Sequence, residues 1–345
     1  MPYLNDKLAE NQEIIRRDKL TAKATRTSRF VFDPESVIAE LKRNIIGQED
    51  VVEAMSDMLY LLKADFSDPN RPLSVNFFLG PTGVGKTETI KILSKALLGD
   101  EKAFCRIDMN TLAQEHYAAA LTGAPPGYVG SKEGHTLFNA DVIEGSFSRP
   151  GIVLFDEIEK ASLEVIRSIL NVLDTGKLRL AGGTKEINFS NSLIFMTSNV
   201  GAREYAQALA KSAKPWRKWL PLLSSSNPEL VLERALKHKF DPEFLNRIER
   251  ILHFNSLGGD VLDAIIDIEL RKLNQRLKNK NAQVTLDPSA RAQIKSYYNE
   301  EYGARNLTQL MRTKLGPVLA KALLEHEEQE IFSVQYKKGQ FGVAV

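Results

Sequence analysis

The sequence predicts an α/β fold with a parallel sheet covered by helices on both faces, followed by a smaller, mainly helical domain. From about residue 45 to 255, short apolar runs rich in β-forming residues alternate with helical patterns. Strands that are apolar along their whole length are typical of parallel sheets buried on both faces. After Gly258-Gly259 the pattern changes to helices. A chain of 345 residues is long enough for two domains of roughly 150 residues each.

The composition excludes several classes of protein. With 43% hydrophobic and 26% charged residues, the chain is neither fibrous nor wholly disordered. Its 46 basic and 44 acidic side chains give a net charge of +2, which supplies no global field to attract nucleic acid or acidic lipid. One cysteine and five separated histidines provide neither a disulfide nor zinc-ligand spacing. The polar start and the absence of an apolar stretch of roughly 18 residues predict a cytoplasmic protein.

The first 33 residues are rich in basic side chains and poor in large apolar ones, so we expect a lone helix or a mobile arm there. A helix is predicted to begin at Pro34, because Asp33 is a suitable N-cap and proline is favoured at the first helical position. We assign residues 1–43 to this N-terminal arm and helix, 44–255 to the large α/β domain and 256–345 to the small domain.

The strands of the large domain are predicted from five apolar runs, at 73–79, 104–107, 152–155, 193–197 and 251–254. In the small domain, an apolar stripe between Val261 and Leu277 predicts one helix, and the pattern from Asn306 to about Glu325 predicts a second helical run. The apolar runs 331–336 and 341–345 predict a closing hairpin that turns at Lys338-Gly339.

A phosphate-binding loop directly follows the first predicted strand. Residues 80–87 match the pattern G-x-x-x-x-G-K-[ST] at every fixed position and lead into a helix. Glycines let backbone N–H groups turn toward a polyphosphate, the lysine reaches the outer phosphates and the threonine hydroxyl can ligate Mg²⁺. A plain glycine-rich turn is the simpler alternative, but the flanking strand and helix favour binding of ATP with Mg²⁺. The predicted binding residues are Gly80, Pro81, Thr82, Gly83, Val84, Gly85, Lys86 and Thr87.

The third predicted strand ends in two acidic residues, Asp156 and Glu157. A parallel sheet exposes such residues at its carboxyl edge, where Asp156 would hold Mg²⁺ through its water shell. Glu157 would polarise the water that attacks the γ-phosphate. Two acids after an apolar strand often only cap a helix, but the phosphate loop upstream favours the catalytic interpretation.

Several further segments occur in a fixed order across roughly residues 45–325. They are IIGQ at 45–48, GPTGVGKT at 80–87, RIDMN at 106–110, GAPPGYVG at 123–130, LFDEIEKA at 154–161, MTSN at 196–199, PEFLNRI at 242–248 and YGAR at 302–305. In this set the chain resembles the AAA+ ATPases of the Clp unfoldase and disaggregase family, and most closely the second nucleotide-binding module of ClpB. The resemblance implies a P-loop AAA+ domain of three α/β/α layers, ATP hydrolysis and a homo-oligomeric ring, a hexamer.

The resemblance also implies roles for individual residues. Ile45 and Ile46 would border the adenine. Asn199 would sense the γ-phosphate, and Arg305 would be a second sensor, so that nucleotide binds between the domains. Arg247 resembles the arginine finger that completes the site of a neighbouring subunit, a contribution worth roughly 10³- to 10⁵-fold in rate in related phosphate-transfer systems. Taken alone, Arg247 would be interpreted as a surface salt bridge.

The segment 123–130 is predicted to be a loop, because its prolines and glycines disrupt both helix and strand. If the family resemblance is set aside, the simpler interpretation is that the aromatic ring of Tyr128 is buried. In the Clp family the matching loop lines the central pore and grips substrate polypeptide, by apolar contacts that tolerate many sequences. The resemblance therefore implies a polypeptide client, not a nucleic acid, held by Gly127, Tyr128, Val129 and Gly130.

The chain also departs from its family. It has no long N-terminal domain, first ATPase module or inserted coiled coil, which makes co-operation with Hsp70 doubtful. No Ile-Gly-Leu or Ile-Gly-Phe tripeptide occurs between Asn199 and Pro242, so a ClpP-type peptidase partner is not expected. A basic segment around Trp216 and Trp219 is either a helix packed on the ATPase core or a docking patch for a partner or membrane surface. Residues 1–33 are a second candidate segment for docking of a partner.

Three functions remain open from the sequence. The first is an ATP-driven, ring-forming protein remodeller that engages its client through Tyr128. The second is a nucleic-acid motor or loader on the same core, against which the near-neutral charge and the lack of a basic-aromatic strand-binding face count. The third is a regulatory ATPase that acts as a switch, since an intact hydrolytic site serves both purposes.

Overall fold

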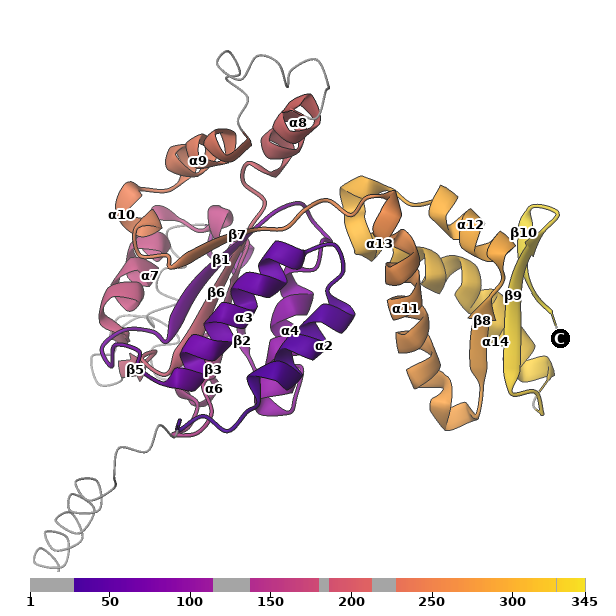
Figure 1. Ribbon diagram of the computed structural model, residues 1–345, viewed down its shortest axis with the longest axis horizontal. Helices are drawn as coiled ribbons and strands as arrows, with labels where there is room; N and C mark the ends of the chain where they lie inside the picture. Colours follow the sequence, from indigo (N-terminus) through magenta and orange to yellow (C-terminus); the bar gives the residue numbers. More distant parts are fainter. Residues whose placement is uncertain (1–27, 114–136, 180–185, 213–227, 327, 345) are drawn as a thin grey trace, which may run out of the picture.

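The computed structural model describes residues 28–113, 137–179, 186–212, 228–326 and 328–344. These residues form a large lobe built around a sheet and a smaller lobe that contains the C-terminal residues (Figure 1). The loop with Tyr128, the segment with Trp216 and Trp219, and residues 1–27 lie outside the described residues. Among the helices that are described, none combines the length and apolarity needed to cross a bilayer.

The central sheet of the large lobe contains five parallel strands in the described part of the chain, in the order β2-β3-β6-β1-β7. The strands are β1 (Ser74–Leu79), β2 (Cys105–Asp108), β3 (Gly151–Asp156), β6 (Ser192–Ser198) and β7 (Arg250–His253). All five predicted strands are therefore confirmed, and so is the α/β fold class. A short antiparallel pair, β4 (Lys177–Arg179) and β5 (Glu186–Asn188), lies apart from this sheet and was not predicted.

A hydrophobic core lies on each face of the central sheet. Phe78 and Phe195 contribute to one core, whereas their neighbours Phe77 and Met196 contribute to the other. Successive strand residues point to opposite faces, and because both faces are covered, β1, β3 and β6 are buried at every position, whereas β2 exposes Arg106 and Asp108. On the first face lie α2 (Pro34–Asn44), α3 (Glu49–Ala64) and α4 (Lys86–Leu98). On the second lie α6 (Ala140–Glu144), α7 (Leu163–Thr175), α9 (Pro228–Lys239) and α10 (Pro242–Leu245).

Helix α2 begins as the sequence predicts. The Asp33 carboxylate accepts a hydrogen bond from the Ser36 N–H at 3.0 Å, and Pro34 occupies the first turn. Val37, Ile38 and Leu41 are buried, and the helix packs against α3 and α4. On the opposite side of the large lobe, α8 (Ala202–Ser212) packs against α9, and both project beyond the sheet (Figure 1).

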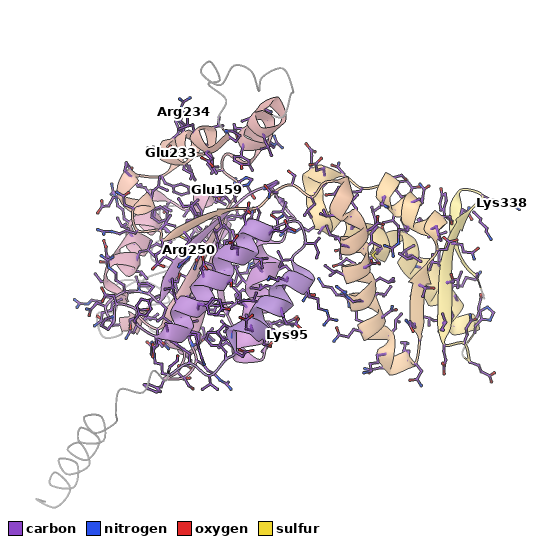
Figure 2. The ribbon with its side chains drawn as sticks, in the orientation of Figure 1. Lys95, Glu159, Glu233, Arg234, Arg250 and Lys338 are labelled. Carbon is purple, nitrogen blue, oxygen red and sulfur yellow. The ribbon has the colours of Figure 1, made fainter. Side chains whose placement is uncertain are left out.

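The small lobe combines helices with a sheet. Its helices are α11 (Leu262–Leu277), α12 (Pro288–Ser296), α13 (Gly303–Leu310) and α14 (Gly316–Glu325), with a π-helical turn, η8 (Met311–Leu315), joining the last two. The predicted hairpin is confirmed as β9 (Ile331–Lys337) and β10 (Gln340–Ala344), and its turn residue Lys338 lies at the far end of the lobe (Figure 2). The strand β8 (Gln283–Leu286), which pairs in parallel with β9, was not predicted.

Short 3-10 turns complete the described structure. They are η1 (Met109–Leu112), η3 (Ile158–Lys160), η5 (Gly259–Val261), η6 (Lys278–Lys280) and η7 (Glu300–Tyr302). Two of them follow strands at the carboxyl edge of the central sheet, η1 after β2 and η3 after β3. Turn η3 therefore begins directly after the predicted catalytic residue Glu157.

Candidate functional site

A pocket of about 440 Å³ lies where the phosphate loop, the carboxyl edge of the sheet and the small lobe meet. Ile45 and Ile46 line it from the large lobe, and Leu257, Ile265 and Ile268 add further apolar surface beside the small lobe. The other predicted residues that line the pocket are Thr82, Gly83, Val84, Gly85, Lys86, Thr87, Asp156, Glu157, Asn199 and Arg305. The pocket thus has an apolar part suited to a flat base and a charged part suited to phosphates.

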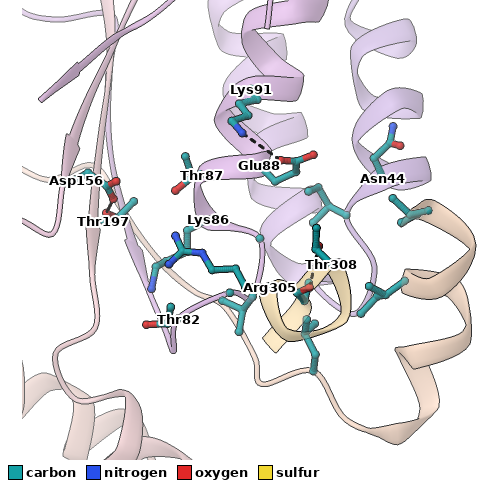
Figure 3. Close-up of a pocket in the computed structure, with 18 of the residues that line it drawn as sticks. Asn44, Thr82, Lys86, Thr87, Glu88, Lys91, Asp156, Thr197, Arg305 and Thr308 are labelled. Carbon is teal, nitrogen blue, oxygen red and sulfur yellow. Dashed lines mark hydrogen bonds and ion pairs between the residues drawn. The ribbon is translucent and has the colours of Figure 1, made fainter. Parts of the chain in front are cut away.

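Lys86 is the first residue of α4 and sits at the centre of the charged part (Figure 3). Its ammonium group donates to the Asn199 side-chain oxygen at 2.7 Å and to backbone oxygens of Pro81, Ser198 and Gly80. Gly80 and Pro81 therefore contact Lys86 although they are not part of the pocket lining. Burial lowers the pKa of Lys86 to about 8, although the charges of Glu159 and Asp156 oppose this shift. Lys86 and Arg305 both line the pocket, and two cations in one pocket favour a polyanionic ligand.

Thr197 joins the two acids at the end of β3. Its hydroxyl donates to the Asp156 carboxylate and accepts from the Glu157 N–H at 3.0 Å. The other carboxylate oxygen of Asp156 accepts from the Arg106 guanidinium, with an Nε–O distance of 2.9 Å. Glu157 itself has a left-handed backbone, with φ at 57°, a conformation that is rare outside glycine and frequent at functional sites. These bonds orient the Asp156 carboxylate and hold the backbone of Glu157 in place.

Asn110 holds the carboxylate of Glu157. The Asn110 side-chain amide donates to the Glu157 carboxylate and, at 2.9 Å, to that of Asp108 at the end of β2. Asn110 and Arg106 belong to the segment RIDMN, and Thr197 belongs to MTSN. Sequence reasoning singled out both segments but missed these three residues, because their partners lie on other strands.

The residues expected to hold Mg²⁺ fit that ion. The Thr87 hydroxyl and the Asp156 carboxylate both line the pocket, and oxygen ligands of these kinds are the ones that Mg²⁺ prefers. Both Asp156 oxygens already accept hydrogen bonds from Thr197 and Arg106, which fits a carboxylate that contacts the ion through water. When bound, the ion would neutralise charge that develops between the outer phosphates.

The phosphate loop touches the small lobe directly. The Gly83 carbonyl accepts a hydrogen bond from the Ala304 N–H at 2.8 Å. A Cβ atom on Gly303 would lie 2.6 Å from the Gly83 oxygen, and one on Gly83 would lie 2.2 Å from the Tyr302 oxygen. Only glycine at both positions permits this approach, and both have positive φ angles. The contact places Arg305, two residues beyond Gly303, at the phosphate end of the pocket.

Gln48 braces the apolar end of the pocket. Its buried side-chain amide accepts from the Asn255 N–H at 2.8 Å and donates to the Asn255 carbonyl at 2.9 Å. These bonds join the turn that follows Ile45 and Ile46 to the segment leading into the small lobe. The motif IIGQ signalled this position in the sequence, but not the partner of its glutamine.

Arg247 does not line the pocket. It follows α10 and forms an ion pair with Asp174 of α7, with an Nε–O distance of 2.7 Å. Within its own chain, Arg247 therefore has the geometry of the simpler salt-bridge interpretation. A role in the pocket of a neighbouring subunit remains a prediction.

Comparison with known proteins agrees with the fold and the pocket. Residues 71–251 match the family model of the AAA domain (Cdc48 subfamily), and residues 257–335 match the C-terminal D2-small domain of ClpB. The chain belongs to the Clp-type AAA+ ATPases. The predicted family and the predicted ATPase class are thus confirmed, whereas the roles of individual residues are not tested by the comparison.

Two relatives of this AAA+ chain match it over nearly their whole length. The ATP-dependent protease ATP-binding subunit-like protein AmiB of Pseudomonas aeruginosa is 43% identical and covers 95% of this chain and 94% of its own. An ATP-dependent protease ATP-binding subunit-like protein of Rhodococcus erythropolis is 38% identical, with 94% and 93% covered.

The longer chaperones match over part of their length. The chaperone protein ClpB of Prochlorococcus marinus is 38% identical over 84% of this chain but only 32% of its own. The AAA+ chain thus spans about a third of ClpB. Among solved structures, a closed-state reconstruction of Hsp104 with ATPγS and FITC casein aligns with a TM-score of 0.74 and 28% identity, covering 90% of this chain and 51% of that one.

Proposed function

We propose that this AAA+ ATPase is a ring-forming protein remodeller that couples ATP hydrolysis to movement of a polypeptide client. The observation that carries the proposal is the convergence of groups from both lobes on one pocket: Lys86, Glu157 and Asn199 from one lobe and Arg305 from the other. A nucleotide bound there contacts both lobes, so its hydrolysis can change the angle between them. The kinship with ClpB and Hsp104 supports a polypeptide as the client.

Each pocket residue has a role in this proposal. Lys86 and Arg305 bind the outer phosphates, while Thr87 and Asp156 hold Mg²⁺. Glu157 takes a proton from the attacking water, and Asn199 contacts the γ-phosphate. Ile45 and Ile46 border the adenine. Arg247 completes the pocket of the next subunit in a homo-oligomeric ring, which we propose to be a hexamer.

The client is proposed to contact Tyr128 together with Gly127, Val129 and Gly130, all in the segment 123–130. Two relatives bear names that mention an ATP-dependent protease. Because residues 199–242 of this chain lack the tripeptide that docks Clp unfoldases on a peptidase, we propose that it works without a ClpP-type peptidase. We also propose that the client is not a nucleic acid.

The proposal can be tested with a client trap. Glu157→Gln should still bind ATP but hydrolyse it about 10²- to 10⁴-fold more slowly, because the water loses its general base. Clients held by this variant can be recovered after crosslinking and identified by mass spectrometry. Adding Tyr128→Ala should empty the trap without affecting ATP binding, whereas Tyr128→Phe should keep it filled.

The matched control is Glu164→Gln, which changes an exposed glutamate in the first turn of α7. That variant should hydrolyse ATP at the normal rate and trap nothing. Normal hydrolysis by Glu157→Gln would refute the proposed base. A trap that stays filled with Tyr128→Ala would refute client gripping by this loop and favour the regulatory ATPase.

A further inference from the structure

A network of polar side chains crosses the cleft between the lobes beside the phosphate loop. Lys272 of α11 forms an ion pair with Glu88 of α4, with a distance of 2.7 Å between Nζ and Oε1. The same ammonium group lies 3.2 Å from the carboxylate of Glu269, one turn earlier on α11. The other oxygen of Glu269 accepts from the Thr308 hydroxyl of α13 at 3.0 Å. The network therefore connects α4 of the large lobe with two helices of the small lobe.

The network is built from residues that line the nucleotide pocket. Glu88 is two residues beyond Lys86, and Thr308 is one turn beyond Arg305 on α13, as Figure 3 shows. Burial alone would lower the pKa of Lys272, but its bonds to Glu88 and Glu269 more than offset this effect and raise the pKa. Lys272 is therefore fully charged at neutral pH, and the Glu269 carboxylate beside it is largely buried, with 12% of the side chain exposed.

Geometry explains what the network can do. The hydrogen bond from Ala304 to Gly83 is one tie between the lobes, and the ion pair between Lys272 and Glu88 is another. Rotation of the small lobe about either contact is further limited by the hydrogen bond from Arg271 to the Arg43 carbonyl and by the apolar core that both lobes share. Because the bond between Glu269 and Thr308 joins α11 to α13, the two ties act on one unit and together restrict that rotation.

We propose that Lys272 is a positioning residue that clamps the small lobe to the phosphate-loop helix through Glu88, holds Arg305 at the phosphates and slows the release of nucleotide. The inference rests on the proposed function in one respect, that nucleotide occupies this pocket. The clamp itself is a contact of the protein with no ligand required. Opening of the cleft must break the pair between Lys272 and Glu88, so the pair sets part of the barrier to nucleotide exchange.

The kinetic test uses Lys272→Met, which keeps most of the side-chain length and removes the charge. A partly exposed pair of this kind contributes about 1 kcal/mol or less, so we expect fluorescent ADP to leave roughly two- to fivefold faster. The KM for ATP should rise more than kcat falls. Lys272→Arg keeps the pair and should restore normal release, while Glu88→Gln should reproduce the methionine variant, with no further effect when the two are combined.

A matched control is an ion pair that lies wholly within the small lobe. Lys295 of α12 forms an ion pair with Asp263 of α11, with 2.5 Å between Nζ and Oδ2, but both residues belong to the small lobe. Lys295→Met should leave nucleotide release unchanged. Faster release by this variant would mean that the effect of Lys272→Met comes from a general loss of stability of the small lobe, and would overturn the clamp. Faster release by Lys272→Met together with normal release by Glu88→Gln would show that Lys272 acts on the nucleotide itself and would overturn the clamp.

A distance measurement tests the clamp without nucleotide. Spin labels can be attached through Lys95→Cys and Lys338→Cys, which lie on α4 and at the far end of the small lobe (Figure 2). The native Cys105 is buried and should not react. In nucleotide-free protein, Lys272→Met should broaden the distance distribution and Lys295→Met should not.

The two measurements separate the hypotheses. An unchanged distribution with Lys272→Met would overturn the clamp even if ATP binds normally. Failure of the unmodified protein to bind ATP would instead refute the proposed function, and the distance measurement would still decide whether the clamp exists.

Discussion

The hydroxyl of Thr197 bonds to both acids at the end of β3, Asp156 and Glu157. It donates to Asp156 and accepts from the Glu157 N–H, and the residue is buried. Thr197→Val keeps the shape and leaves both partners unsatisfied, so we expect a loss of about 1–2 kcal/mol of stability and a kcat at least about tenfold lower. Denaturant unfolding and single-turnover hydrolysis measure these effects. Thr197→Ser retains the hydroxyl, so its stability and kcat should stay near those of the unmodified protein. An unchanged kcat in Thr197→Val would contradict this role of the hydroxyl.

His253, the last residue of β7, should make the protein sensitive to acid. Its ring contacts the ring of Tyr205 at a tilt, with 3.8 Å between centroids. Burial lowers the pKa of His253 to about 4, against an opposing effect of Asn255, and the charge of Lys86 adds to the lowering. The unfolded chain takes up a proton near pH 6.5 and the folded chain only near pH 4. The unfolding free energy should therefore keep its full value above pH 6.5 and decrease as the pH is lowered toward 4.

The loss attributable to His253 should be about 1–2 kcal/mol, because the ring is only partly shielded from solvent. His253→Phe keeps a ring against Tyr205 and removes the titrating group. The unfolding free energy, measured with denaturant at several pH values between 4 and 7, should therefore change less with pH in this variant, giving a shallower slope. His238→Gln, at an exposed position of α9, should leave the slope as it is. Equal slopes for His253→Phe and the unmodified protein would refute this role.

The site residues that sequence reasoning found and missed differ in one respect. Lys86, Asp156 and Glu157 belong to contiguous patterns with their own chemistry, so one stretch of sequence is enough to identify them. Thr197 acts on acids 40 and 41 positions away in the chain, and the partner of Lys272 in the large lobe, Glu88, is 184 positions away. The residues next to Thr197 and Lys272 in the sequence carry no sign of these contacts. Their roles follow from the order of the strands and from the packing of the two lobes.

At the scale of elements, the entry into α13 should control nucleotide affinity. Gly303 has φ at 55° and touches the phosphate loop, so Gly303→Ala adds backbone strain of about 1–3 kcal/mol and pushes the helix away from Gly83. Arg305 moves with the helix, and we expect the affinity for ATP to fall about tenfold or more. Gly316, in α14, has open space around it and a helical backbone. Gly316→Ala should bind ATP normally; equal affinities in a nucleotide titration of both variants would contradict this role of α13.

The elements that the sequence predicts are those whose pattern is local. The strands at 74–79 and 151–156 are buried along their whole length and appear in the sequence as mainly apolar runs. Strand β8 has the sequence QVTL, with Val284 its only buried residue, and pairs with β9 some 48 positions later. A four-residue strand of this kind depends on a distant partner, so no pattern inside it distinguishes it from the end of α11.

At the scale of the whole molecule, Arg247 has two interpretations, as a structural ion pair within its own chain or as part of the pocket of a neighbouring subunit. If it serves only the ion pair with Asp174, then Asp174→Asn and Arg247→Ala should have the same modest effect on stability and activity. If it completes the pocket of an adjoining subunit, Arg247→Ala should lower kcat by about 10³-fold or more, while Asp174→Asn should remain active. Mixing Arg247→Ala with Lys86→Ala should then recover activity, because some pockets receive an intact lysine and an intact arginine from different subunits.

Steady-state ATP hydrolysis, measured across the mixing ratio of the two variants, detects this recovery. A mixture that stays inactive at every ratio, or an Asp174→Asn variant as inactive as Arg247→Ala, would exclude a pocket shared between subunits.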